Sequence, residues 1–221
     1  MNRAILRHGF LVGTFLFLGY GFQTLGLQYT TPANAGFITG LSVVIVPFLS
    51  VFFLRLRPPL NAWIGVVCAL LGLSLLSFDK FSMDFGDFLV LLGACSFAMH
   101  LILVGKYSPH YDPVLLTTAQ IGTVTLLSSI LGIQSPPVFN QPVVEAVIIT
   151  AVFATVLAFL IQTMAQKHTS ATRTALIFAM EPVFAALSSY LLINEMFTVQ
   201  KIAGCLLILV GMIITEIKVH R

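Results

Sequence analysis

Charge is scarce in this sequence. Only 9% of its 221 residues are Asp, Glu, Lys or Arg, while 58% are hydrophobic, and the mean hydropathy is +1.01. Soluble domains carry charge at about a quarter of their positions. Disordered chains contain few aromatic residues, whereas this chain has 19 Phe. No polar stretch is long enough to fold as a separate domain. The composition therefore excludes a soluble or disordered protein and predicts an integral membrane protein in contact with the lipid bilayer.

Motifs for catalysis, metal binding and ATP hydrolysis are also absent from the sequence. It has no Walker A motif, and no HExxH, GxSxG or paired-aspartate motif. Its Lys and Arg residues are scattered between apolar runs, so we expect no nucleic-acid partner. The three cysteines lie inside apolar runs without CxxC or Cys/His spacing, which argues against a disulfide framework or a metal site. We therefore expect no enzyme activity, no metal and no cofactor. The cysteines are Cys68, Cys95 and Cys205.

Eight apolar runs are long enough to cross a bilayer, which takes about 20 mostly apolar residues in a helix. The breaks between them have the composition of turns, as in TTPAN at 30–34 and SPHYDP at 108–113. The first run is too long for a signal peptide and lacks a convincing A-x-A cleavage site. The sequence predicts an all-α integral membrane protein with eight transmembrane helices, at about 6–28, 33–54, 61–78, 86–106, 113–132, 143–166, 171–193 and 199–217.

Lys and Arg in the loops predict the orientation, because they are enriched on the cytoplasmic side of membrane proteins. With the N-terminus in the cytoplasm, nine of these residues fall inside and only Lys80 and Lys201 fall outside. We expect a multi-pass protein of the cell (cytoplasmic) membrane with both termini cytoplasmic. The inside residues are Arg3, Arg7, Arg55, Arg57, Lys106, Lys167, Arg173, Lys218 and Arg221; the acids Asp79, Asp84, Asp87 and Glu195 fall outside.

An internal repeat is present at a constant offset of 139 residues. It relates polar residues and glycines, which are harder to match by chance than leucines. The glycines of each copy are seven residues apart, hence on one helix face, and we interpret them as allowing close approach of another helix. The matched pairs are Gln23-Thr24 with Gln162-Thr163, Thr30-Thr31 with Thr169-Ser170, and Gly65 and Gly72 with Gly204 and Gly211.

The offset amounts to five predicted helices, an odd number, so the two copies have opposite orientations in the membrane. Inverted-topology repeats are typical of secondary transporters, which alternate access by moving one repeat against the other. The predicted organisation is an incomplete first repeat at 1–78 (helices 1–3), a second repeat at 86–217 (helices 4–8) and a cytoplasmic tail at 218–221.

Two helices open the second repeat without a counterpart in the first, so a complete pair would contain ten helices. We expect this difference to reflect a misassigned start, a fragment or degraded gene, or a genuine short form. A homodimer, or a partner that supplies the two helices, is then an expected arrangement.

Two stretches carry a family resemblance. NAGFITGLSVVIVPFLSVFFLRLRP at 34–58, and TSATRTALIFAMEPVFAALSSYLLINE at 169–195 with the glycines that follow, resemble the EamA family of the drug/metabolite transporter superfamily. The resemblance covers nearly the whole chain. It implies ten helices in two inverted five-helix repeats, a central substrate cavity and, commonly, efflux of small metabolites. The first two of those helices have no counterpart in this sequence.

Glu181 is the first candidate for a functional residue. It lies about ten residues into a predicted helix, or ~15 Å at 1.5 Å per residue, which is near the membrane midplane. A charge at that depth costs roughly 2.5–3.5 kcal/mol and usually serves a function. Glu181 is expected to bind a cationic or polar substrate group or to carry a coupled proton; otherwise it is a neutral acid bonded to a neighbouring helix. Pro182 removes a backbone donor and predicts a kink that could also expose carbonyls to substrate.

Further candidates are uncharged polar groups in the apolar runs. His100 could shuttle a proton or donate to a neighbouring helix. Gln120, Gln162 and Gln23 could contact substrate, with Gln120 the best placed of the three, or could serve as hydrogen bonds between helices. Tyr20 could line a cavity, although packing explains it as well.

The repeat and the carboxylate together favour a secondary transporter of the drug/metabolite type. We expect it to export a small organic metabolite or amphipathic compound across the cytoplasmic membrane by alternating access. The alternative is a truncated or partner-dependent membrane subunit without transport activity of its own.

Overall fold

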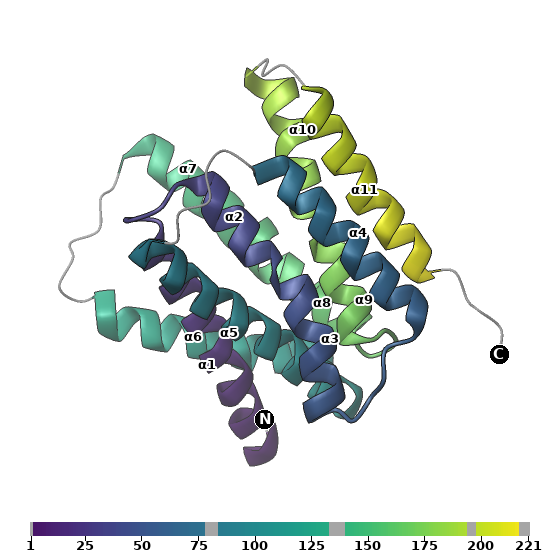
Figure 1. Ribbon diagram of the computed structural model, residues 1–221. Coiled ribbons are helices and arrows are strands. Elements are labelled where there is room, and N and C mark those ends of the chain that lie inside the picture. Colours follow the sequence, from purple (N-terminus) through teal and green to yellow (C-terminus); the bar gives the residue numbers. More distant parts are fainter. Residues whose placement is uncertain (1, 78–83, 133–139, 194–197, 217–221) are drawn as a thin grey trace.

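The apolar runs form helices because an unpaired backbone N–H or C=O in hydrocarbon costs several kcal/mol. The computed structural model describes residues 2–77, 84–132, 140–193 and 198–216 (Figure 1). Its helices, in chain order, are α1 (Arg3–Gly26), α2 (Pro32–Gly40), α3 (Ser42–Phe53), α4 (Leu60–Ser77), α5 (Phe85–Tyr107), the short η1 (Ser108–His110), α6 (Pro113–Gly132), α7 (Gln141–Ile149), the π-helical η2 (Thr150–Leu157), α8 (Ala158–Ala165), α9 (Ala171–Phe178), α10 (Glu181–Ile193) and α11 (Val199–Glu216).

Helices occupy every range that the sequence analysis predicted, with ends within three residues of those expected. Five helical stretches in the described part of the chain are long and apolar enough to cross a membrane, and Leu60–Leu76 and Val199–Thr215 are shorter apolar helices. The predicted class, an all-helical membrane protein, is confirmed. Several predicted residues lie outside the described ranges: Asp79, Lys80, Glu195, Lys218, Arg221 and the tail at 218–221.

Three of the predicted helices are not continuous. The range 33–54 is divided at Leu41 into α2 and α3, and the range 171–193 is divided at 179–180 into α9 and α10. The second break confirms the predicted kink, since Pro182 is the second residue of α10 and has no N–H to continue the helix. The range 143–166 contains the π-helical turns of η2 between α7 and α8. Hydropathy reports apolar length, so it revealed neither η2 nor the break at Leu41.

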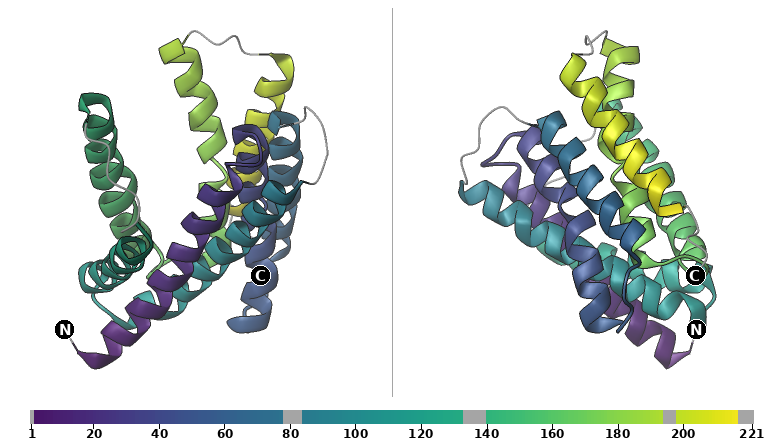
Figure 2. Two further views of the ribbon diagram at one scale, coloured as in Figure 1. Left: turned by 90° about the vertical axis from the view of Figure 1, so that its left-hand side faces the viewer. Right: turned by 45° about the vertical axis from the view of Figure 1, so that its right-hand side comes forward.

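The helices pack as two groups (Figures 1 and 2). α4 and α11 lie side by side along one edge of the molecule, and α1 packs along α5 and across α6. The approach of α1 to α6 is close: a Cβ at Gly13 would lie 2.5 Å from the backbone oxygen of Gln120. α2 and α3 connect the groups, because each packs on both α5 and α4.

The main apolar core lies toward one end of the molecule. It joins the C-terminal half of α5 to α3, α4 and the N-terminal half of α9, and its members are nearly fully buried. The other end, where α2 and α11 begin and α4 ends, contains a cavity described below. One end is therefore packed and the other is hollow. The core includes Val43, Val46, Val66, Ala69, Ala98, Leu101, Ile102, Ala171, Ala175 and Leu176.

The helix from α7 to α8 has few neighbours. Only 6% of its most apolar stretch within Gln141–Ala165 is buried, compared with 33% for α1. Its exposed side chains are apolar, for example Ile148, Val152 and Phe153. Lipid tails can cover such a surface as well as a protein can, since both are apolar. This face is therefore suited to the hydrocarbon of a bilayer.

Elements related by the 139-residue offset share their boundaries. Adding 139 to the ends of α4 gives the ends of α11, and the starts of α2 and α3 give those of α9 and α10. The caps agree too: Thr31 accepts from Asn34 N–H at the start of α2, as Ser170 does from Arg173 N–H at the start of α9. The matched residues in sequence thus occupy matched places in the helices.

Candidate functional site

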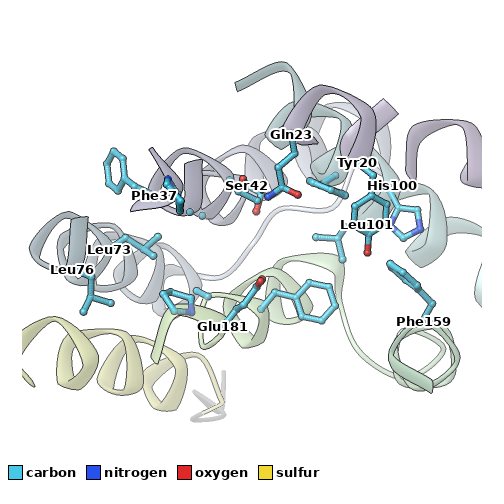
Figure 3. A pocket seen from close by; sticks show the side chains of 18 of the residues that line it. Tyr20, Gln23, Phe37, Ser42, Leu73, Leu76, His100, Leu101, Phe159 and Glu181 are labelled. Atoms are coloured by element: carbon cyan, nitrogen blue, oxygen red, sulfur yellow. Dashed lines mark hydrogen bonds between the residues drawn. The ribbon is translucent and has the colours of Figure 1, made fainter. Parts of the chain in front are cut away.

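A cavity of about 460 Å³ lies where the two interrupted helices meet (Figure 3). Both breaks contribute: Gly40 and Ser42 flank the first, while Ala179 and Glu181 flank the second. The walls are mainly apolar and aromatic with few polar groups, the usual composition of a small-molecule site. The full lining is Tyr20, Gln23, Pro32, Gly36, Phe37, Thr39, Gly40, Ser42, Leu73, Leu76, Phe97, His100, Leu101, Phe159, Phe178, Ala179, Glu181, Pro182 and Lys201.

Glu181 is the carboxylate of this cavity. It is the first residue of α10, and its side chain is exposed to the cavity. The partial positive charge of a helix N-terminus stabilises a carboxylate there. Within the described residues, Glu181 makes no hydrogen bond and no ion pair, so the predicted alternative of an acid bonded to a neighbouring helix is not seen. Its oxygens are available to a bound molecule.

His100 lies at the aromatic end of the cavity and connects α5 to α6. Its side chain is 2% exposed, and its Nε2 lies 2.9 Å from Oε1 of Gln120. Gln120 is fully buried and donates from Nε2 to Thr163 Oγ1 on α8 at 3.3 Å. Gln120 itself does not line the cavity. Any part it has in a site therefore passes through His100.

The other two predicted glutamines differ in position. Gln23 lines the cavity and donates to Thr39 Oγ1 at 3.0 Å, which joins α1 to α2. Gln162 lies away from the lining, 4% exposed, and donates to Gln166 Oε1 at 3.1 Å. Of the six predicted residues, the structure thus brings Glu181, Pro182, His100 and Gln23 together and leaves Gln120 and Gln162 outside the cavity.

Aromatic residues form one end of the cavity, and of these the sequence analysis singled out Tyr20 but not Phe97 or Phe159. Tyr20 contacts Phe97 edge to face, with centroids 5.3 Å apart, and Phe159 at 6.4 Å. His100 also meets Phe159 edge to face at 5.6 Å. For Tyr20 both readings apply, since it packs on these rings and lines the cavity as well.

The repeat could have located several of these residues. Lining residues occur in pairs related by the 139-residue offset, so a position found in one copy predicts one in the other. Such pairs also place both helix breaks at the cavity. They are Tyr20 with Phe159, Thr39 with Phe178, Gly40 with Ala179 and Ser42 with Glu181.

The arrangement can bind a molecule. The carboxylate of Glu181 attracts a cationic or hydrogen-bond-donating group, and the rings can hold a flat or apolar body. Lys201 is the other charged residue of the lining. No group of three His, Cys, Asp or Glu residues suited to a metal ion occurs in the part of the chain that the structure describes.

Comparison with known proteins gives consistent matches. The model of the EamA-like transporter family matches residues 2–78 and 84–217. An uncharacterized transporter of Archaeoglobus fulgidus is 35% identical over 96% of this chain and 70% of its own length, and the uncharacterized transporter YyaM of Bacillus subtilis is 26% identical over 88% and 68%. A solved protein structure superimposes with a TM-score of 0.83 at 18% identity, over 98% of this chain and 77% of that one, which shows a shared fold.

Proposed function

Because the chain belongs to the EamA-like transporter family of the drug/metabolite transporter superfamily, we propose that it is a secondary transporter whose cavity at the helix breaks binds a small organic solute. One observation carries the assignment of the site: the carboxylate of Glu181, which makes no hydrogen bond or ion pair with the described residues, lines that cavity from the N-terminus of α10. The solute that complements it has a cationic or hydrogen-bond-donating group and an apolar or aromatic body.

We propose alternating access between two inverted repeats as the mechanism. The chain then crosses the membrane eight times, with three helices in a first repeat (1–78) and five in a second (86–217). The shared boundaries of α4 and α11, the matched caps and the paired cavity residues support this organisation. Interrupted helices at a central site are typical of transporters that rock one repeat against the other.

The proposed orientation places both termini in the cytoplasm of a cell whose cytoplasmic membrane holds the protein. The support is the bias of Lys and Arg toward the loops on that side. The packed core then lies in the cytoplasmic half, and the cavity opens toward the outside. We propose export as the direction of transport, an inference from the family resemblance.

The test compares Glu181→Gln with Glu145→Gln. Glu145 is also a helical glutamate, exposed on α7, and it accepts a hydrogen bond from Gln141 of its own helix, so its substitution controls for loss of a charge. A library of small organic solutes is screened for thermal stabilisation of the purified protein, and the stabilising solutes are then assayed for transport in proteoliposomes. A hydrogen bond to a charged group contributes about 1.5–3 kcal/mol, so Glu181→Gln should weaken binding roughly 10- to 100-fold.

The two variants distinguish a role of the Glu181 carboxylate from a general effect of losing a charge. Glu145→Gln should bind and transport like the wild type. If Glu181→Gln does so too, the carboxylate is not part of the site.

A further inference from the structure

We propose that Gln120 is a positioning residue that holds His100 in its neutral Nε2–H tautomer, so that His100 offers the cavity a hydrogen-bond acceptor at Nδ1. The inference rests on the proposed function only where it concerns the bound solute. It assigns a role to Gln120, which lies outside the cavity, and defines the hydrogen-bonding character of His100, which lines it.

The structural basis is a buried chain of hydrogen bonds across three helices. It runs from His100 on α5 through Gln120 on α6 to Thr163 on α8. Thr117, also on α6, donates to Thr163 Oγ1 at 3.2 Å. All four side chains are at most 4% exposed, so water does not compete for these bonds. In such surroundings each donor needs an acceptor, because a buried polar group without a partner is costly.

The direction of each hydrogen bond follows from Thr163, the last residue of this series of hydrogen bonds. Thr163 has a single hydroxyl proton, and it donates that proton to the backbone oxygen of Phe159 at 2.7 Å. Its oxygen can then only accept from Gln120, so the amide nitrogen of Gln120 faces Thr163. The amide oxygen must face His100. Because that oxygen cannot donate, the proton of the contact belongs to His100 Nε2.

A neutral imidazole protonated at Nε2 has a bare lone pair at Nδ1. Within the described residues, no hydrogen bond uses this nitrogen. His100 lines the cavity, and Figure 3 places its ring beside Tyr20 and Phe159, on a different wall from Glu181. Glu181 and Nδ1 of His100 therefore both act as acceptors. The solute they fit carries two separated donor groups, such as an ammonium and a second N–H or O–H.

Nitrogen NMR of the histidine-labelled protein in lipid nanodiscs tests the tautomer without any transport assay. The His100 resonances are identified by their loss in His100→Gln. We expect Nε2 to appear as a protonated nitrogen and Nδ1 as a bare one. A wild type protonated at Nδ1, or at both nitrogens at neutral pH, overturns the inference.

Two matched substitutions test whether the hydrogen bonds through Gln120 set the tautomer of His100. Thr163→Val removes the group that orients the Gln120 amide, so both tautomers of His100 should become populated. Thr117→Val removes a buried hydroxyl bonded to the same Thr163 oxygen but leaves Gln120 bonded, so the Nε2–H tautomer should persist. Equal spectra for the two variants refute positioning through Gln120, provided that both retain the helical circular dichroism of the wild type. If either variant loses that helicity, Thr163→Ser, which keeps the orienting hydroxyl, must retain the wild-type tautomer.

The exposure of Nδ1 to the cavity is tested with two neutral probes. Acetamide has N–H donors, whereas N,N-dimethylacetamide has none. Acetamide should shift the Nδ1 resonance and N,N-dimethylacetamide should leave it in place. A shift with both probes, or with neither, refutes the acceptor role. These spectra do not depend on Glu181, so loss of transport in Glu181→Gln and failure of this inference are separate results.

Discussion

The contact between α4 and α11 leads to a prediction about Gly72. A Cβ at this position would lie 2.6 Å from the backbone oxygen of Gly204 and 2.7 Å from Cγ1 of Ile208. The backbone oxygen cannot rotate away as a side chain could. To reach an ordinary contact of about 3.4 Å, the two helices would have to separate by roughly 0.8 Å along their closest line. Overpacking of this kind costs about 1–3 kcal/mol.

We therefore expect Gly72→Ala to lower the free energy of unfolding by about 1–3 kcal/mol. The measurement is reversible unfolding in mixed micelles of dodecyl maltoside and SDS. Gly122 in α6 provides a matched control, because a Cβ there meets nothing within 4 Å. Gly122→Ala should be neutral or stabilise by up to about 1 kcal/mol, since alanine loses less backbone entropy in a helix.

A double substitution sharpens this test. Gly65 makes the equivalent contact about two turns earlier in α4, where a Cβ would lie 2.6 Å from the backbone oxygen of Gly211. Once Gly72→Ala has separated the helices, Gly65→Ala should cost less than it does alone, so the two losses should not add. If Gly72→Ala behaves like Gly122→Ala, or if the losses add fully, the close backbone contact does not limit this interface.

Three further predictions concern Arg55, Asp87 and the pair Ser42 and Glu181. Arg55 has φ of 54°, in the left-handed region, so Arg55→Gly should stabilise the protein by about 1 kcal/mol in the same unfolding assay while Arg57→Gly should not. Asp87 is 2% exposed and accepts hydrogen bonds from the Thr30 hydroxyl and from the N–H of Asp84. Asp87→Asn should therefore lower the free energy of unfolding by about 1–3 kcal/mol. The control Asp112→Asn should change this free energy little, because Asp112 lies at an exposed helix start where Asn also caps well. Ser42→Glu combined with Glu181→Ser moves the carboxylate to the equivalent helix start; solute binding should recover to within about tenfold of the wild type, and a double variant as weak as Glu181→Ser alone would contradict the equivalence of the two positions.

Sequence reasoning was most successful where one residue decides the local structure. Apolar length located the helices, and Pro182 located the break between α9 and α10 because proline removes a backbone donor at any depth. No proline lies within five residues of the break at Leu41, although Gly40 directly precedes it. There the N–H of Leu41 is shared between the carbonyls of Phe37 and Ile38, a tightening of the turn that packing selects.

For the polar residues of the site, the sequence could not predict which side chains would be hydrogen-bond partners. His100 and Gln120 were recognisable as unusual in apolar runs, but their hydrogen bond depends on which helices are neighbours and how each is rotated. The buried role of Asp87 was missed for the same reason, since its partner Thr30 is 57 residues away and the charge pattern predicted only the side of the membrane on which Asp87 lies. Spacing identifies the groups, whereas tertiary packing decides their partners.

The cavity combines near-symmetry in shape with asymmetry in charge. Equivalent helix starts, at Ser42 and Glu181, face it from its two interrupted helices. The start of α10 carries a carboxylate, whereas the start of α3 carries the uncharged hydroxyl of Ser42. Lys201 is the other charged residue of the lining. The two ends of the site thus differ in the charge they prefer, so a solute held between them binds in one orientation. A single carboxylate gives a near-symmetric scaffold a defined polarity for its substrate.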